Sequence, residues 1–412
     1  MGQFLLFLSF LFSLFLLFKN LGGEYVLENK RIAFLLKKKF NFHTLFKSMT
    51  DIRKNPSIKL QTILVSLFLM PFFSLTSLLS LDRESRTKAF KGIFGCKRKM
   101  VASDSTFRRV LGWLHQQQIA AFLMSFLLSF EKENLLRRKL VAGGTYRRVG
   151  ILDGTHMGGH WLVALCLTGK INYPALTRPY RKKGDELATS RKIIKDSRKI
   201  LGPTCPNLWL LDGLYFNKTT FCDVRNQHSH LLIKVEKAKF REVLRDAENL
   251  FQHFGGDLEK EQFDSQRLCS WKIKQTTDTF AGYPVQIIHL VEFYPKRKKN
   301  RQIECWIITT DPSLSLEEIR EAAHLRWQIE NNVFKRISHH AGTKRFYFKD
   351  PRAFFNLLHI FFAAMVLFDA IICILRRETE LFKSLLNGIK PTWRNVFSQL
   401  KERFNYNIFG FA

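Results

Sequence analysis

The chain has 412 residues and a formal net charge of +31, because 66 Lys and Arg outnumber 35 Asp and Glu. Hydrophobic residues make up 46% and charged residues 25%, which excludes a disordered basic tail and a multi-span membrane protein. The positive charge therefore lies on a folded body and indicates a polyanionic partner, either nucleic acid or an anionic membrane. The seven cysteines show no CxxC spacing, which indicates free thiols in a reducing compartment and argues against a zinc site.

The chain begins with an apolar segment. Residues 4–18 consist of Phe, Leu and Ser, and this run is shorter than the roughly 20 residues that a membrane-spanning helix requires. It lacks a preceding positive charge and is followed by a poor cleavage site. We treat residues 1–30 as a leader that is either a start-site artefact or dispensable segment, or an export or anchoring signal, and expect a cytoplasmic protein.

Residues 31–145 predict an all-helical N-terminal domain that contacts DNA. The apolar stretch 58–81 is interrupted by Pro71, which favours two buried helices over a membrane span. Residues 103–106 form an N-cap cluster ahead of a segment whose apolar residues recur at spacings of three and four. The basic residues 97–99 and 108–109 lie near the turns, where they either touch phosphates or form a solvated surface.

Residues 146–340 predict an α/β domain. Three short apolar or alternating runs indicate an antiparallel meander, and helices alternate with buried strands after it. The resulting order, β-β-β-α-β-α-β, predicts a sheet of mixed strand direction that resembles the ribonuclease-H-like core. The strands are expected at 149–154, 160–167, 173–180, 208–211 and 230–235, and the helices at 185–200 and 217–226.

The alternation breaks at about 238–300, where we expect a β-rich insertion with strands at 270–276 and 283–294 and a cation-rich turn at 296–301. A buried strand at 305–311 and a long helix that begins at Ser315 and continues past Glu330 complete the domain. Residues 341–412 predict a helical C-terminal region. Its apolar segment 351–375 is long enough to span a membrane, but its charged residues favour core packing.

Three acids occupy positions where strand and helix ends would bring them together. Asp153 and Asp212 each end a predicted strand and precede a glycine, and Glu330 lies on the late helix. Carboxylates from separate elements that converge on two Mg²⁺ ions about 3.5–4 Å apart are the ligands of a two-metal phosphoryl-transfer site. A lone Asp-Gly after a strand is usually a turn, so only the joint spacing supports such a site.

The segments ILDGTH, LLDGLYF and LRWQIENNVFK, which carry these acids, resemble the three catalytic blocks of DDE transposases of the insertion-sequence-4 type. The resemblance implies metal-dependent cleavage at transposon ends followed by strand transfer. Asp153, Asp212 and Glu330 would be catalytic and would bind Mg²⁺, for which Mn²⁺ can substitute. It also implies DNA as the partner, a homodimer when synapsed on DNA, and no small-molecule substrate.

Ala323 occupies the family's Tyr position, and Ile337 and Ser338 occupy its Lys positions. The alternative is therefore a catalytically decayed copy that acts only as a basic DNA-binding protein.

Basic and aromatic residues near the acids are candidate DNA contacts. Arg326 lies one helical turn before Glu330, where it holds a phosphate, orients the carboxylate or forms a plain ion pair. Trp327 either stacks on a flipped base or packs in the core. His156, His160 and His230 are expected near the acids as DNA contacts or core residues. The full set of predicted DNA contacts is Arg326, Trp327, Lys335, Arg178, Arg181, Lys182 and Lys183.

Overall fold

The computed structural model describes residues 49–71, 75–87, 102–235, 241–254, 258–265, 269–295, 301–340, 342–343 and 348–378. The chain divides into two compact units. The helical unit comprises residues 1–133, 157–159 and 335–412, and the sheet unit comprises residues 134–156 and 160–334. The apolar leader, the basic residues 97–99 and residues 296–300 of the cation-rich turn lie outside the described residues.

The helical unit begins with short helices whose ends follow from local sequence. Helix α4 ends at Leu69, just before Pro71, as the proline predicts. Ser103 accepts a hydrogen bond from the Thr106 amide, which caps α7 as the N-cap cluster predicts. The helices are α4 (Leu60–Leu69), α5 (Leu78–Ser85), α7 (Asp104–Trp113), α8 (Gln116–Met124), α9 (Leu127–Lys132), α14 (Lys335–His340) and α15 (Pro351–Glu378).

Helix α15 is the core of the helical unit and packs against α4, α7 and α8. The buried Asn356 amide donates to the carbonyls of Leu111 (2.8 Å) and Leu114 (2.9 Å), which ties α15 to the end of α7. Residues 351–370 are long and apolar enough to cross a membrane, yet 89% of the apolar window is buried inside the fold. This burial supports the expected core packing of the segment.

The sheet unit contains a nine-stranded sheet in the order β5-β4-β3-β6-β7-β11-β10-β9-β8. Strands β3, β6 and β7 run parallel to one another. The neighbouring pairs β4–β5, β7–β11, β11–β10, β10–β9 and β9–β8 are antiparallel. The expected α/β class with mixed strand direction is therefore confirmed. The strands are β3 (Val149–Met157), β4 (His160–Thr168), β5 (Asn172–Tyr180), β6 (Leu208–Asp212), β7 (His230–Val235), β8 (Leu258–Asp264), β9 (Cys269–Phe280), β10 (Tyr283–Tyr294) and β11 (Arg301–Thr309); β1 (Arg138–Lys139) and β2 (Tyr146–Arg147) form a separate pair.

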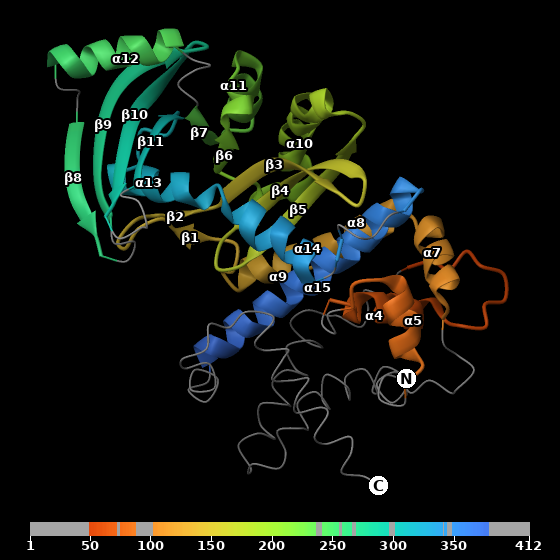
Figure 1. Ribbon diagram of the computed structural model, residues 1–412. Coiled ribbons are helices and arrows are strands. Elements are labelled where there is room, and N and C mark those ends of the chain that lie inside the picture. Colours follow the sequence, from red (N-terminus) through yellow and green to blue (C-terminus); the bar gives the residue numbers. More distant parts are fainter. Residues whose placement is uncertain are drawn as a thin grey trace. The chain divides into compact units, whose positions relative to one another are not determined.

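Helices cover the central strands of this sheet. Figure 1 shows α10 (Glu186–Leu201) and α11 (Lys218–Arg225) on one side of the strands and α13 (Leu316–Leu325) on the other. Because both faces are covered, the four apolar residues of β6 before Asp212 are all buried, as the apolar run predicts. Helix α12 (Arg241–Phe254) lies at one end of the long strands β9 and β10 (Figure 1).

Two local predictions are wrong. β3 continues to Met157, so Asp153 lies inside the strand and not at its end. The predicted long helix is interrupted, because α13 ends at Leu325 and a π-helix, η7 (Ile329–Phe334), precedes α14. A π turn contains an extra residue and changes the direction of the side chains that follow, which the 3.6-residue pattern in the sequence does not reveal.

The segment predicted as a β-rich insertion does not form a sheet of its own. β11 pairs with β7 on one side and with β10 on the other, so that β10, β9 and β8 extend the central sheet. The strand β8 was not predicted, because its sequence LEKEQFD is mostly polar and lacks the apolar alternation of a half-buried strand. It forms the edge of the sheet, where charged side chains reach solvent.

Candidate functional site

The three acids meet around one guanidinium group in the sheet unit. Nη1 of Arg326 lies 3.8 Å from Oδ2 of Asp153, and Nε lies 4.0 Å from Oδ1 of Asp212. Nη2 lies 3.7 Å from Oε1 of Glu330. The structure thus brings together the acids that the sequence selected from three separate blocks.

The register of the sheet explains why Asp153 and Asp212 lie side by side on neighbouring strands. β3 and β6 are parallel neighbours, and Ile151 is the register partner of Leu210. Asp153 and Asp212 lie two residues further along these strands, so their side chains emerge on the same face. Arg326 is the C-cap residue of α13, and Glu330 follows in the first turn of η7.

The electrostatics differ among the acids. The side chain of Asp153 is 13% exposed, whereas those of Asp212 and Glu330 are 45% and 42% exposed. Burial raises the pKa of Asp153 to about 7, and although Arg326 opposes this rise, the other nearby carboxylates add to it. Within the described part of the chain, the buried Nε of Arg326 has no hydrogen-bond partner. The guanidinium therefore lies close to all three acids at distances longer than those of hydrogen bonds.

A fourth acid, Glu186, lies beside this group. Its carboxylate accepts hydrogen bonds from the hydroxyls of Tyr215 (2.8 Å) and Tyr180 (3.2 Å). A Cβ added to Gly154 would lie 2.3 Å from the Glu186 carboxyl carbon, so the glycine allows the close approach. The sequence analysis missed Glu186; the signal was an acid in the first turn of the helix that follows β5.

Lys234 was also missed. It is the register partner of Asp212 on the neighbouring strand β7. Its ammonium lies 4.7 Å from the ring centroid of Trp327, the residue after Arg326. The signal was a single lysine within the otherwise apolar run HLLIKV, near the end of a buried strand.

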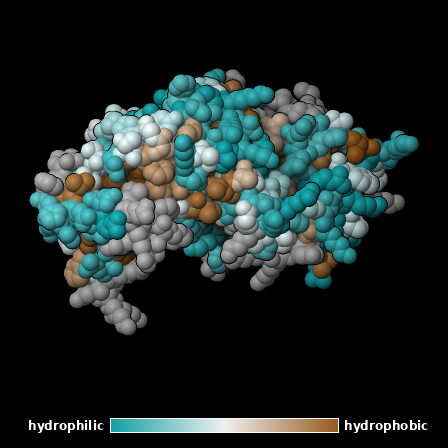
Figure 2. All heavy atoms as spheres, turned by 90° about the horizontal axis from the view of Figure 1, so that it is seen from above, coloured by the Kyte–Doolittle hydropathy of each residue, from teal (hydrophilic) through white to brown (hydrophobic). Residues whose placement is uncertain are grey.

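Within the described residues of the sheet unit, no hydrogen bond or ion pair joins Arg178, Arg181 or Lys182 to the acids of this site. Arg178 forms an ion pair with Asp196 (2.5 Å). Arg181 and Lys182 are exposed, the side chain of Lys183 lies outside the described part, and the exposed Lys335 belongs to the helical unit. Most residues on the face drawn in Figure 2 are hydrophilic, as expected for a charged, solvated surface.

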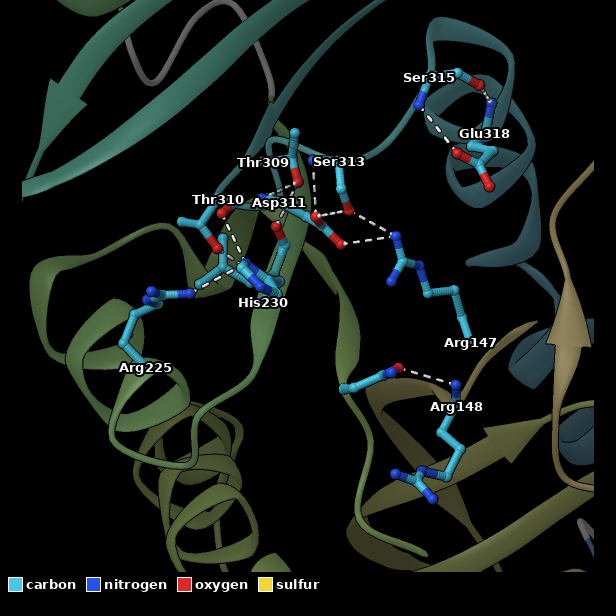
Figure 3. Close-up of polar contacts among 12 residues, drawn as sticks. Arg147, Arg148, Arg225, His230, Thr309, Thr310, Asp311, Ser313, Ser315 and Glu318 are labelled. Atoms are coloured by element: carbon cyan, nitrogen blue, oxygen red, sulfur yellow. Dashed lines mark hydrogen bonds and ion pairs between the residues drawn. The ribbon is translucent and has the colours of Figure 1, made fainter. Parts of the chain in front are cut away.

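The expected position of His230 is wrong. It pairs with Leu208 at the start of β6, whereas Asp212 is at the end of that strand. Nδ1 of His230 lies 2.7 Å from the Thr310 carbonyl and 3.0 Å from Nη1 of Arg225 (Figure 3). In the same cluster, Asp311 accepts from the Ser313 hydroxyl and lies 3.6 Å from Arg147. The rings of His156 and Trp161 are tilted by 46° to each other, with centroids 4.5 Å apart.

No protein-family model matches the sequence, and no curated protein is similar to it. Among the described residues, no group of three or more His, Cys, Asp or Glu is arranged to hold a metal ion, and the cysteines are free. The acids at this site instead surround the Arg326 guanidinium.

Proposed function

We propose that the protein is a DNA transposase that uses Asp153, Asp212 and Glu330 as a DDE triad for strand cleavage and transfer. The observation that carries the proposal is the meeting of these three acids around Arg326. Each acid was selected from its own sequence block, and chance would rarely bring all three to one cation. Water would cleave the strand, and the freed 3′-OH would then attack a target phosphate without a covalent protein intermediate.

The sheet topology supports the proposal. The order β5-β4-β3-β6-β7, with parallel β3, β6 and β7, resembles the strand order expected of a ribonuclease-H-like core and so supports the proposal. The extra elements α12 and β8 to β10 fall between the second Asp and the Glu. DDE transposases of the insertion-sequence-4 type carry their β-rich insertion at this place in the chain.

The donor chemistry fits Mg²⁺, because oxygen ligands from carboxylates are those that this ion prefers, and the acids already gather around a positive group. Asp153, Asp212 and Glu330 would hold it. When bound, divalent cations supply activation of the attacking oxygen and stabilisation of the leaving oxygen.

The chain's own residues prepare this site. Arg326 provides one positive charge to three acids, which reduces their mutual repulsion. Because burial raises its pKa to about 7, Asp153 would have to release its proton before it could serve as a ligand near neutral pH. The two tyrosines hold the Glu186 carboxylate next to Gly154, one residue from Asp153.

Substitution of the acids tests the proposal. We expect Asp153→Asn, Asp212→Asn and Glu330→Gln each to lower Mg²⁺-dependent DNA strand cleavage by more than about a hundredfold. Loss of a residue that only supports a metal ligand already lowers activity by up to about a hundredfold, and loss of a ligand itself should cost more. DNA binding should change little, because the basic surface is intact. Asp278→Asn, at an exposed residue of β9, is the matched control and should cleave normally. Near-normal cleavage by any one triad variant would remove that residue from the triad.

The same assay separates the second candidate, a decayed copy that only binds DNA. Ala323 and Ile337, at the family's Tyr and Lys positions, are both buried and offer no polar group to a phosphate. If the wild-type chain binds DNA but cleaves nothing in Mg²⁺ or Mn²⁺, the decayed copy is the correct description. DNA as partner, a homodimer on DNA and a cytoplasmic location belong to the same proposal.

A further inference from the structure

Lys234 occupies a defined place beside the acids. It is level with Asp212 on the parallel strand β7, so the two side chains lie next to each other on the same face of the sheet. Arg326 contacts Asp212 through Nε, and the following residue, Trp327, lies at the Lys234 ammonium. Asp212 therefore has cationic groups from two different elements beside it.

The contact with Trp327 orders Lys234 without neutralising it. A ring face attracts an ammonium group but accepts none of its three N–H donors in the way a carboxylate does. Within the described residues, no carboxylate forms an ion pair with Lys234. The ammonium thus lies at a defined position with no described carboxylate paired to it, an arrangement that suits a phosphate group.

A phosphate needs such a residue at this site. When ionised, Asp153, Asp212, Glu330 and Glu186 repel a DNA backbone, and the charge of Arg326 is already shared among three of them. Among the described residues, Lys234 is a cation at this site that forms no ion pair with a carboxylate. Since Asp212 is half-exposed, a ligand can reach the space beside it.

We propose that Lys234 binds a backbone phosphate of DNA beside Asp212 and that Trp327 holds the lysine in place. This inference rests on the proposed function, because it places the DNA at the same acids. Lys234 is then a substrate-binding residue, and Trp327 is a positioning residue that acts through it.

Salt dependence of DNA binding tests the inference. Binding of the full chain to a short labelled duplex is measured by fluorescence anisotropy across salt concentrations, with EDTA present. Removing one phosphate contact lowers the slope of log affinity against log salt by about 0.9. We expect this change for Lys234→Gln and Lys234→Met, the latter keeping the aliphatic stem against Trp327. Lys218→Gln, an exposed lysine on α11, is the charge-matched control and should keep the wild-type slope.

Two further variants separate charge from position. Lys234→Arg should keep the slope, because it keeps the cation and the ring contact. Trp327→Leu should keep the slope but weaken binding several-fold, whereas Trp327→Phe should bind as the wild type does. A wild-type slope in folded Lys234→Gln and Lys234→Met, with folding checked by thermal unfolding, would overturn the inference.

Cleavage distinguishes failure of this inference from failure of the proposed function. At saturating DNA in Mg²⁺, Lys234→Gln should cleave at least about tenfold more slowly than Lys218→Gln, the effect expected for a lost hydrogen bond to a charged group. If the wild type cleaves nothing but Lys234→Gln still lowers the salt slope, the phosphate contact stands and the catalytic proposal fails. If the wild type cleaves and Lys234→Gln changes neither slope nor rate, only this inference fails.

Discussion

Arg320 and Arg326 lie six residues apart in the sheet unit, and each is surrounded by acids, but their contacts with these acids differ. Arg320 lies within α13, and its guanidinium donates to Glu292 (2.7 Å) and Asp264 (2.8 Å). Its Cζ lies 5.2 Å from the centre of the Trp271 ring. All three charged side chains are largely buried. The strands β8, β9 and β10 are thus tied to α13 by one hydrogen-bonded ionic cluster.

Arg326 follows the same helix, and no hydrogen bond from its guanidinium to a described residue is found. Its contacts with Asp153, Asp212 and Glu330 are about 1 Å longer than those of Arg320, in line with ion pairs rather than hydrogen bonds. Two of these acids are also half-exposed. A satisfied cluster fixes structure, whereas an unsatisfied one leaves donors and acceptors for a ligand.

One acid in each cluster has a shifted pKa, and the two shifts have opposite directions. Burial would raise the pKa of Glu292, but the hydrogen bond and charge of His324, together with Arg320, outweigh it and lower the pKa to about 2. At Asp153 burial prevails over Arg326 and the pKa rises to about 7. The fold therefore stabilises the ionised form of Glu292 but destabilises the ionised form of Asp153. Carboxylates with a raised pKa are common at functional sites.

Breaking the satisfied cluster should have the largest effect on stability. Arg320→Gln removes the guanidinium that the buried Glu292 and Asp264 share, and removing one partner of a buried ion pair costs about 3–5 kcal/mol. Urea denaturation measures the free energy of unfolding. Arg326→Gln is the matched control on the same helix and should lose far less. Equal losses in both variants would contradict the distinction between the clusters.

Removing the charge of Asp153 should stabilise the protein at high pH. Because its pKa is higher in the folded state than the ordinary 3.8, the folded chain binds the extra proton, and stability falls as pH rises from about 4 to about 7. Above that range the cost amounts to at most about 4 kcal/mol. Asp153→Asn lacks this cost, so its advantage over the wild type should grow with pH in unfolding measurements made with EDTA. A pH-independent difference would show that the carboxyl is not strained.

The sequence predicted the strands and helices whose apolar pattern is local. The run at 208–211 and the helices α10 and α11 appear where the pattern placed them. The acids could be selected because Asp-Gly after a strand and the RWQIE segment are visible within a few residues. The extension of the sheet through β11 could not be predicted, because it depends on pairing between strands far apart in the chain.

The importance of Glu186 and Lys234 could not be predicted either, because it also depends on contacts between residues far apart in the chain. Glu186 matters because Gly154 leaves room for it, and Lys234 matters because of its register with Asp212. The π-helix at Glu330 has the apolar spacing of an ordinary helix in the sequence. Local sequence therefore indicates the three acids, whereas tertiary pairing determines which cations and further acids lie beside them.

Protonation of Glu292 at acid pH should have the next largest effect on the free energy of unfolding. A pKa lowered in the folded state gives stability that is present above the ordinary value of 4.5 and is lost as pH falls towards about 2. Glu292→Gln should therefore be less stable than the wild type at neutral pH, with the difference shrinking by about 3 kcal/mol across that acid range. Glu304→Gln, an exposed acid paired with His289 on the same sheet, is the control and should show little change.

The smallest effect should be the coupling between Arg326 and Glu330. Their ion pair is long and half-exposed, and such pairs contribute about 0.2–1 kcal/mol that salt screens. A double-mutant cycle of Arg326→Gln with Glu330→Gln, measured by urea unfolding, should give a value in this range that decreases at high salt. The parallel cycle of Arg320→Gln with Glu292→Gln should give several kcal/mol and respond little to salt, because both partners are buried. A large, salt-independent coupling for Arg326 would mean that its guanidinium is fixed in the fold, and the acids around it would then have no freedom to rearrange around a bound ligand.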